Sequence, residues 1–314
     1  MKKYIIIALV FLTACHQSSK VPVVGFADAF EDNTIEQAKT GFTDALAKNG
    51  FDEKNGTVKI IYRNAQGNIP TLTQIINYFI SEKVNLIAAN ASLSAITAIQ
   101  KTKSIPVFMM VAPTPTLMKV NDAHGNPPSN LFGVGENLDY IDTSFLLIPK
   151  IITKKSLVVG MIYNQSEPQS VEAINRIAQL AKDNNIMLVS LPVNSSADVQ
   201  LVTAALLNKH IDAFFANPDN TVFASFETIN KLCKDAKVPV FTSEAGLVSR
   251  GALVAYGADL YQWGYQAGEQ AAKYLKGDKD LHWEMVQLRK RVYNPGMAKY
   301  YQLNIPSGFE PIKQ

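Results

Sequence analysis

The chain is poor in cysteine and histidine, the residues that build disulfides, reactive thiols and many metal sites. Among its 314 residues it has two cysteines, Cys15 and Cys233, and four histidines. Because Cys15 belongs to an N-terminal leader, the body of the chain has no internal disulfide and depends on its hydrophobic core. The histidines do not have the spacing of metal ligands. We therefore expect neither a metal nor another cofactor.

A strong charge of one sign and the common catalytic motifs are also missing. The formal net charge of +3 falls to +1 when the two leader lysines, Lys2 and Lys3, are subtracted. A nearly neutral chain has no basic field to hold nucleic acid. There is no Gly-x-Ser-x-Gly elbow and no phosphate-binding glycine loop, and Cys233, the cysteine outside the leader, has no histidine beside it. We expect no nucleic-acid partner and no enzymatic activity.

The apolar run near the N-terminus, Tyr4 to Leu12, is shorter than the roughly 20 residues that cross a bilayer. It follows two lysines and ends at Leu12-Thr13-Ala14-Cys15, which has the form of a lipobox. We expect residues 1–14 to be a signal peptide, Cys15 to carry acyl chains, and residues 15–20 to be a lipidated linker. An ordinary secretory signal with an incidental cysteine is the alternative. The anchored reading places the protein in the cell envelope, on the periplasmic or extracellular face.

What the chain has in abundance is alternating strand-like and helical segments. Runs rich in Val, Ile and Phe predict strands, and apolar residues at helical spacing predict the helices between them. The predicted strands are 21–27, 57–64, 84–90, 105–111, 156–163, 186–193, 212–216, 238–242, 252–257 and 285–293. The first helix is predicted from a capping box, Asn33-Thr34-Ile35-Glu36. Later helices are predicted near 168–184, 196–208, 221–235 and 259–276.

The same strand and helix order occurs twice, which predicts an α/β fold of two Rossmann-like lobes. A length prior of about 150 residues per domain agrees. The chain is expected to cross between the lobes near residues 135, 255 and 289, giving three hinge crossings. Lobe 1 is predicted to comprise 21–134 plus 256–288, and lobe 2 to comprise 135–255 plus 289–314.

Ligands of open parallel sheets bind beyond the carboxyl ends of the strands. Polar and aromatic residues follow the predicted strands in both halves of the chain. The candidate ligand-binding residues are Asp28, Phe30, Gln66, Ser92, Ser94, Thr114, Tyr163, Asn164, Asp219, Asn220, Thr221, Glu244 and Tyr256. The aromatic members of this set can stack on an apolar part of a ligand.

Two features of this set suggest how a ligand is held. Ser92 and Ser94 begin a helix whose free backbone donors favour an anionic group such as a carboxylate, although plain N-capping explains them equally well. Asp219 and Glu244 follow adjacent strands, and either can pair with a ligand ammonium. Asp219 can also simply cap the helix that begins near Thr221.

Several short motifs, taken in order, resemble one known family. They are Ala65-Gln66-Gly67-Asn68, Gly133-Val134-Gly135, Tyr163-Asn164 with Glu167 and Ser170, Pro218-Asp219-Asn220-Thr221-Val222, and Gly251-Ala252-Leu253 before Tyr256-Gly257. The series resembles the ABC transporter substrate-binding family that includes tryptophan- and tyrosine-linked lipoproteins, from about Val21 to Pro306. The sequence departs from the family pattern at Asn90-Ala91-Ser92, where relatives commonly have Thr-Pro, and at Pro113-Thr114-Pro115, where they have Asp-Pro.

The resemblance implies the type I periplasmic-binding fold, with a ligand enclosed between two lobes. It implies an aromatic amino acid as ligand, with its carboxylate near Ser92 and its ammonium at Asp219 or Glu244. It also implies an ABC permease and an ATPase as partners, membrane attachment by the lipid alone, and a monomeric protein. The alternatives are a sugar- or polyol-binding protein, and a sensor or adhesin displayed on the cell surface.

Overall fold

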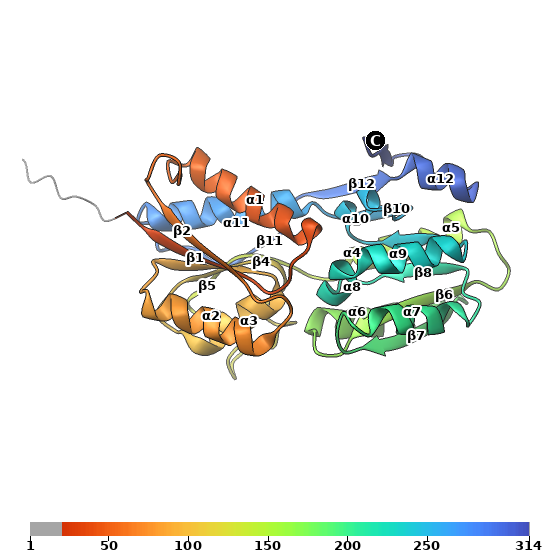
Figure 1. The fold of residues 1–314 in the computed structure, drawn as a ribbon, viewed down its shortest axis with the longest axis horizontal. Coiled ribbons are helices and arrows are strands. Elements are labelled where there is room, and N and C mark those ends of the chain that lie inside the picture. The colour runs from red at the N-terminus through yellow and green to blue at the C-terminus, as the bar shows by residue number, and fades with distance from the viewer. Residues whose placement is uncertain (1–20, 314) are drawn as a thin grey trace, which may run out of the picture.

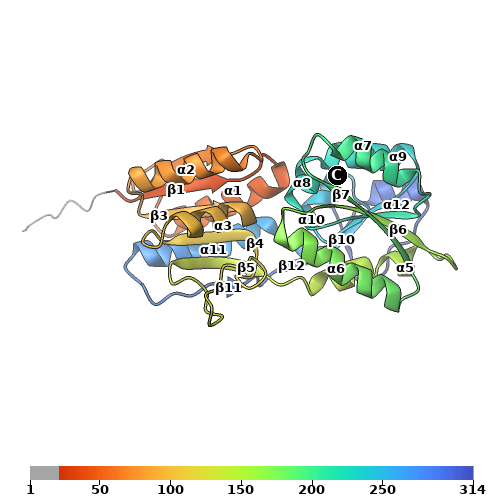
Figure 2. The same cartoon turned by 90° about the horizontal axis from the view of Figure 1, so that it is seen from below.

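Two α/β lobes lie end to end in the computed structural model, which describes residues 21–313 (Figure 1). In each lobe helices cover both faces of a central sheet, as Figure 2 shows from below. The predicted signal peptide and Cys15 lie outside the described residues. No helix between Val21 and Lys313 is both long and apolar enough to span a membrane.

The first lobe is built on a parallel sheet. Within the described residues this sheet has six strands in the order β11-β5-β4-β3-β1-β2. They are β1 (Val23–Asp28), β2 (Lys59–Asn64), β3 (Leu86–Asn90), β4 (Val107–Pro113), β5 (Leu131–Glu136) and β11 (Glu284–Met285). The helices of this lobe are α1 (Asn33–Lys48), α2 (Ile69–Ser81), α3 (Ser92–Lys101) and α11 (Leu260–Leu275). β3 is buried along its whole length, as the continuous apolar run in its sequence indicates.

The second lobe has a mixed sheet. In the described chain it has seven strands in the order β13-β12-β10-β9-β8-β6-β7, and only β10 and β12 pair antiparallel. They are β6 (Val158–Asn164), β7 (Met187–Val193), β8 (Ala213–Ala216), β9 (Val240–Thr242), β10 (Val254–Ala258), β12 (Arg289–Tyr293) and β13 (Glu310–Pro311). Its helices are α4 (Tyr140–Phe145), α5 (Ile148–Ile151), α6 (Pro168–Asp183), α7 (Val199–Leu207), α8 (Asn220–Ala224), α9 (Phe226–Asp235), α10 (Ala245–Ser249) and α12 (Pro295–Tyr301).

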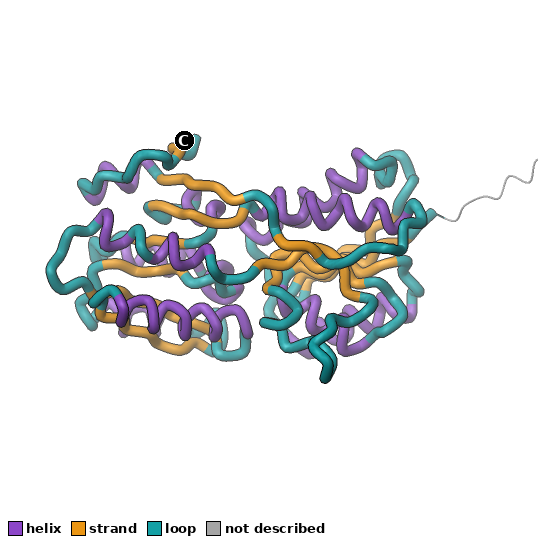
Figure 3. The backbone as a smooth tube through the Cα atoms, turned by 180° about the vertical axis from the view of Figure 1, so that it is seen from behind, coloured by secondary structure: helices purple, strands orange, loops and turns teal. Residues whose placement is uncertain are grey.

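The chain passes between the lobes three times over residues 21–313, and Figure 3 shows these segments from behind. It leaves the first lobe after β5, returns between β10 and α11, and leaves again between β11 and β12. β10 continues to Ala258 within the second sheet, so the return lies after that residue. The predicted fold of two Rossmann-like lobes joined by three crossings is therefore confirmed.

Helices α1 and α11 pack with their backbones in contact, although the second lobe separates them in sequence. A Cβ atom on Gly264 would lie 1.9 Å from the carbonyl oxygen of Ala38. One on Gly41 would lie 2.0 Å from that of Tyr261. Glycine is required at both positions because any side chain would separate the helices.

Three local predictions were wrong in detail. The N-cap of α1 is Asp32 and not the predicted Asn33, because the Asp32 carboxylate accepts the amides of Thr34 and Ile35 at 2.8 and 2.9 Å. The helix predicted over 221–235 is two helices, α8 and α9, that meet at Ser225. The strand predicted over 285–293 is also two elements, β11 and β12, because residues 286–288 bridge the lobes and the two strands join different sheets.

Candidate ligand-binding site

A small pocket lies between the lobes, where the carboxyl ends of strands from both sheets meet. The first lobe contributes Ser92, Val111, Ala112, Pro113, Glu136 and Trp263. The second contributes Leu138, Tyr140, Gln169, Pro218, Asn220, Phe223 and Glu244. Most of the wall is apolar or aromatic, with a few polar groups, which is the usual composition of a small-molecule site.

The end of β4 is distorted where it forms the pocket wall. Its pairing with β5 shifts register between Met109 and Ala112. Val111 has a φ of 50°, a left-handed value that is uncommon for a β-branched residue. A bulge of this kind turns a strand locally, and backbone strain tends to gather at functional sites. Here it brings three successive residues, 111–113, to the pocket.

Glu136 is a buried acid at the end of β5, directly at the first crossing between the lobes. Its Oε2 accepts a hydrogen bond from Arg289 Nη2 at 2.5 Å, and Arg289 begins β12 after the third crossing. Its Oε1 has no hydrogen-bond partner among the described residues. Burial raises the pKa of Glu136 to about 7, against the opposing effect of the Arg289 charge.

Glu244 is a second buried acid, placed after β9 of the other lobe. Its Oε1 accepts a hydrogen bond from the Tyr140 hydroxyl at 3.0 Å. Within residues 21–313 its Oε2 makes no hydrogen bond of normal geometry, and the neighbouring Ser243 hydroxyl only lowers the pKa of the acid from nearby. Burial raises the pKa of Glu244 to about 8; the Tyr140 hydrogen bond opposes this rise, and the negative charge of Glu136 adds to it.

A third unpartnered acceptor comes from the first turn of α6. Gln169 donates its side-chain nitrogen to Glu167, while its Oε1 finds no donor in the described chain. Buried polar atoms in native proteins nearly always have a partner, so each exception needs an explanation. Three unpartnered oxygens on the wall of one pocket, from Glu136, Gln169 and Glu244, are explained by a ligand that brings the donors.

The N-terminus of α3 lies at the same pocket through Ser92. The first amides of a helix have no acceptor within the helix, and no side chain caps this end. The Ser94 hydroxyl is used elsewhere, as a donor to the carbonyl of Asn90 at 2.8 Å. Free amides and the helix dipole together favour an anionic group at this end of the pocket.

The N-terminus of α8, in the other lobe, is filled by the protein's own carboxylates. Asp219 accepts the amide of Val222 at 3.0 Å and the amide of Asn164 at 2.6 Å. Its Oδ2 also accepts the Ser170 hydroxyl at 2.5 Å. Glu167 accepts the amides of Asn220 and Thr221 at 2.9 and 3.2 Å. Neither carboxylate has an oxygen left without a partner in the described residues.

Comparison with known proteins shows to which family the chain belongs. The family profile described as ABC transporter substrate binding protein matches residues 20–308. The chain belongs to that family. A protein named tyrosine-binding protein from Clostridioides difficile is 33% identical over 260 residues, which cover 83% of this chain and 74% of the relative. The recognition made from the sequence motifs is confirmed, and so is the function of an ABC solute-binding protein.

Solved structures share the fold of this substrate-binding protein. A conserved domain protein from Vibrio cholerae has 27% identity and a TM-score of 0.86, covering 94% of this chain and all of the other. A domain from Streptococcus pneumoniae in complex with L-Trp has 21% identity and a TM-score of 0.83, with 91% and 96% of the two chains covered.

The residues proposed from the sequence lie in several places in this substrate-binding protein. Ser92, Asn220 and Glu244 line the pocket between the lobes. A second hollow between the lobes is lined by Phe30, Gln66, Asn164 and Thr221. Asp28 lines a third, on the first lobe, together with Phe30 and Gln66. The remaining five do not line these three hollows: Ser94, Thr114, Tyr163, Asp219 and Tyr256.

Ten of the thirteen residues that line the pocket of this substrate-binding protein were not predicted from the sequence, among them Glu136, Gln169, Phe223 and Trp263. Glu136 carried a usable signal, because it is an acid directly after the apolar run Leu131–Gly135 at a predicted crossing. Gln169 stands in the first turn of a predicted helix, a position that many polar residues occupy. Phe223 and Trp263 come from helices, and their spacing is that of ordinary core residues.

Proposed function

We propose that this protein binds a free aromatic L-α-amino acid in the pocket between its lobes, as the solute-binding subunit of an ABC importer. The proposal rests on one observation: the same pocket contains buried oxygens that lack donors and helix amides that lack acceptors. Three buried oxygens without donors require positive, hydrogen-bonding chemistry, and the uncapped start of α3 requires an anion. A zwitterionic α-amino group and carboxylate satisfy both.

The ammonium belongs at Glu136 and Glu244. Its three donors match three acceptors, Glu136 Oε1, Glu244 Oε2 and Gln169 Oε1. Two ionised glutamates and the nearby Arg289 sum to one negative charge, which one ammonium neutralises. Asp219 is the weaker candidate because its oxygens already accept three hydrogen bonds.

The ligand side chain belongs against the apolar part of the wall. Phe223 and Trp263 offer ring surfaces, and Val111 and Leu138 add aliphatic surface. The relative named tyrosine-binding protein supports an aromatic amino acid over a sugar or polyol. A sugar would supply hydroxyls to the glutamates but no anion for α3.

The remaining sequence predictions fit this role and stay proposals. They are cleavage before Cys15, a lipid anchor at that residue, an extracytoplasmic position, ABC permease and ATPase partners, and a monomer. We also propose that binding is not coupled to catalysis. In the described chain no group of three or more His, Cys, Asp or Glu side chains could hold a metal ion. The predicted lobe limits, 21–134 plus 256–288 and 135–255 plus 289–314, likewise stay proposals.

The test is calorimetric titration of residues 21–314, unfolded and refolded first to remove any ligand that purifies with the protein. L-Tyrosine, L-tryptophan and L-phenylalanine are the ligands. Tyramine lacks the carboxylate that the start of α3 would bind. 3-(4-Hydroxyphenyl)propionate lacks the ammonium that the three unpartnered oxygens would bind. We expect binding of at least one aromatic amino acid and of neither analogue. Binding of arabinose or myo-inositol in place of every amino acid would overturn the proposal.

A further inference from the structure

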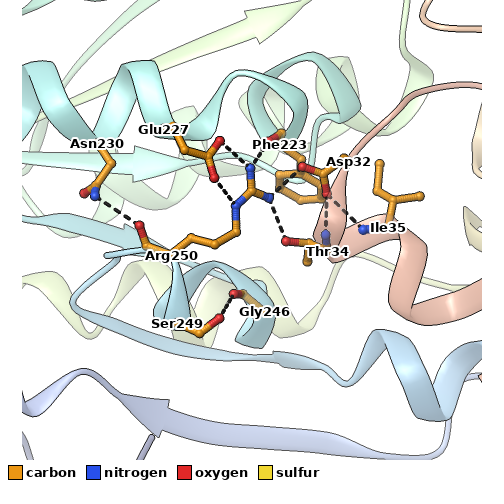
Figure 4. Close-up of polar contacts among 9 residues, drawn as sticks. All are labelled: Asp32, Thr34, Ile35, Phe223, Glu227, Asn230, Gly246, Ser249 and Arg250. Atoms are coloured by element: carbon orange, nitrogen blue, oxygen red, sulfur yellow. Dashed lines mark hydrogen bonds and ion pairs between the residues drawn. The ribbon is translucent and has the colours of Figure 1, made fainter. Parts of the chain in front are cut away.

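A cluster of charged and polar side chains joins the two lobes outside the ligand pocket (Figure 4). Arg250 follows α10 in the second lobe, and Asp32 caps α1 in the first. Arg250 Nη1 lies 2.6 Å from Asp32 Oδ2 and 2.7 Å from the Thr34 hydroxyl. The Asp32 side chain is 1% exposed and that of Arg250 is 13% exposed, so solvent screens this ion pair little.

Arg250 is held in place by its own lobe before it meets the other. Its Nε and Nη2 donate to the two oxygens of Glu227, each at 2.7 Å. Nη2 also donates to the carbonyl of Phe223 at 2.9 Å, and the guanidinium lies 5.4 Å from the centre of the Phe226 ring. An ordered guanidinium loses little further entropy when it meets a partner on the first lobe.

Asp32 is equally ordered within the first lobe. Its Oδ1 accepts the amides of Thr34 and Ile35, which leaves Oδ2 directed at Arg250 (Figure 4). Asp32 and Arg250 are therefore each held in position by hydrogen bonds within their own lobe. Two preformed halves on two hinged bodies can separate and meet again without local refolding.

The surfaces around the ion pair fit closely. A Cβ atom on Gly246 of α10 would lie 2.4 Å from the Thr34 Cγ2 atom of the opposite lobe. A side chain at Gly246 would therefore act as a wedge between the lobes. This steric fit does not depend on the charges, and it indicates the same close approach of the two lobes as the ion pair does.

The cluster does not form part of the pocket wall. Arg250, Asp32, Glu227 and Gly246 are not among the residues that line it. The single shared residue is Phe223, which lines the pocket and accepts a hydrogen bond from Arg250 through its carbonyl. Changes at Arg250 therefore leave the proposed ligand contacts in place.

We propose that Arg250, Asp32 and Thr34 form a latch that holds the lobes closed, and that Arg250 is thereby a positioning residue for ligand binding. Opening the lobes breaks the contacts of Arg250 with Asp32 and Thr34 and keeps those with Glu227. The latch adds to the closed population whether or not a ligand is present. Because apparent affinity scales with the fraction of competent protein, a protein without the latch binds less tightly through a faster dissociation.

The experiment measures the distance between the lobes in the unliganded protein and at saturating L-tyrosine. Cysteines at Gln100 and Ser195, exposed residues on opposite sides of the second hollow, carry spin labels. The variants are Arg250→Gln, Gly246→Val and Asp32→Asn, the last of which keeps Oδ1 as the helix cap. Lys231→Gln is the matched control, because its ion pair with Asp235 lies within one lobe.

We expect Arg250→Gln and Gly246→Val to shift the unliganded protein toward longer distances, and Lys231→Gln to leave it unchanged. The double variant Arg250→Gln/Asp32→Asn should open no further than either single variant. For Arg250→Gln the dissociation rate of L-tyrosine should rise about tenfold, with a smaller change in the association rate.

The latch is refuted if Arg250→Gln and Gly246→Val fold normally and leave both distance distributions unchanged. Should Arg250→Gln fail to fold, Gly246→Val decides alone. A wild-type protein that binds none of L-tyrosine, L-tryptophan and L-phenylalanine contradicts the proposed ligand class, while the unliganded distances still test the latch.

Discussion

The starts of helices α3 and α8 stand in opposite lobes at the edge of the same pocket, yet they are built in opposite ways. Four backbone amides around the start of α8 donate hydrogen bonds to Asp219 and Glu167, two carboxylates of the protein itself. The start of α3 has no side-chain cap, and two acids that line the same pocket, Glu136 and Glu244, each keep one oxygen free among the described residues. A buried acid with all its oxygens occupied stabilises the fold, and one with an unoccupied oxygen is available to a ligand.

Asp219→Ala should give the largest effect, and that effect should be on stability. It removes the acceptor of the Val222 and Asn164 amides and of the Ser170 hydroxyl, all of them buried. Losing a cap and leaving buried donors unpaired should lower the free energy of unfolding by about 3 kcal/mol. Urea unfolding measures this. Asp198→Ala, at the half-buried N-cap residue of α7 whose side chain makes no cap hydrogen bond, should cost under about 1 kcal/mol. If Asp219→Ala kept full stability and lost affinity, Asp219 would be the ammonium site.

Glu244→Gln should show the reverse pattern. The amide oxygen still accepts the Tyr140 hydroxyl, but its nitrogen would stand where the ammonium is expected. Loss of a buried charge pair should weaken L-tyrosine binding by about 2 kcal/mol, or roughly 30-fold, with no loss of stability. Calorimetric titration measures the affinity. Glu172→Gln, on the exposed face of α6, serves as the control. Equal affinities for the two variants would remove Glu244 from the site.

The pH dependence should differ between ligand affinity and the stability of the unliganded protein. The pKa values of Glu136 and Glu244, about 7 and 8, lie above the ordinary 4.5. Their protonated forms therefore stabilise the unliganded fold, fully below pH 4.5, and this stability is lost as the pH rises through 7 to 8. An ammonium needs the ionised forms, so affinity should instead rise on the order of tenfold between pH 6 and 8.

Thermal unfolding from pH 5 to 8.5, with and without L-tyrosine, measures both trends. The melting temperature of the unliganded protein should fall as the pH rises. The increase in melting temperature that L-tyrosine causes should become larger. Burial also raises the pKa of Asp28 to about 6 and the pKa values of Glu167 and Asp219, so part of the unliganded slope belongs to these three acids. The Glu244→Gln variant isolates the contribution of Glu244. An increment independent of pH in the wild type would exclude an ammonium at the two glutamates.

Ser92→Asp should make α3 resemble α8, with the smallest effect of the four. A carboxylate in the first turn satisfies the helix dipole and competes with the ligand carboxylate. We expect L-tyrosine to bind about fivefold more weakly, or roughly 1 kcal/mol, and the unliganded protein to be no less stable. Ser92→Ala is the control, since the proposed donors are backbone amides that it keeps. If Ser92→Ala weakened binding as much as Ser92→Asp, the hydroxyl and not the helix terminus would hold the ligand.

The alternation of apolar segments was enough to predict the lobes, because buried strands and amphipathic helices have periods of their own. This pattern was not enough where contacts between distant segments determine where an element begins or ends. The segment 285–293 has strand-like residues throughout, but only the separation of the two sheets splits it into β11 and β12. At the site, Glu244 and Ser92 were found because they follow strands. Glu136 also follows an apolar run but was missed, and its ion pair with Arg289, far along the chain, is a contact that only the structure shows.

The contact between α1 and α11 means that the first lobe cannot finish folding until α11 has been synthesised. α11 lies more than two hundred residues after α1, beyond nearly all of the second lobe, and its glycines rest directly on the α1 backbone. As the chain emerges from its N-terminus, residues 21–136 must wait with part of one face of their sheet uncovered, because α1 covers that face only in part. The second lobe, apart from β12 to β13, is present before that cover arrives. Truncation near residue 258 would therefore damage the lobe that was made first.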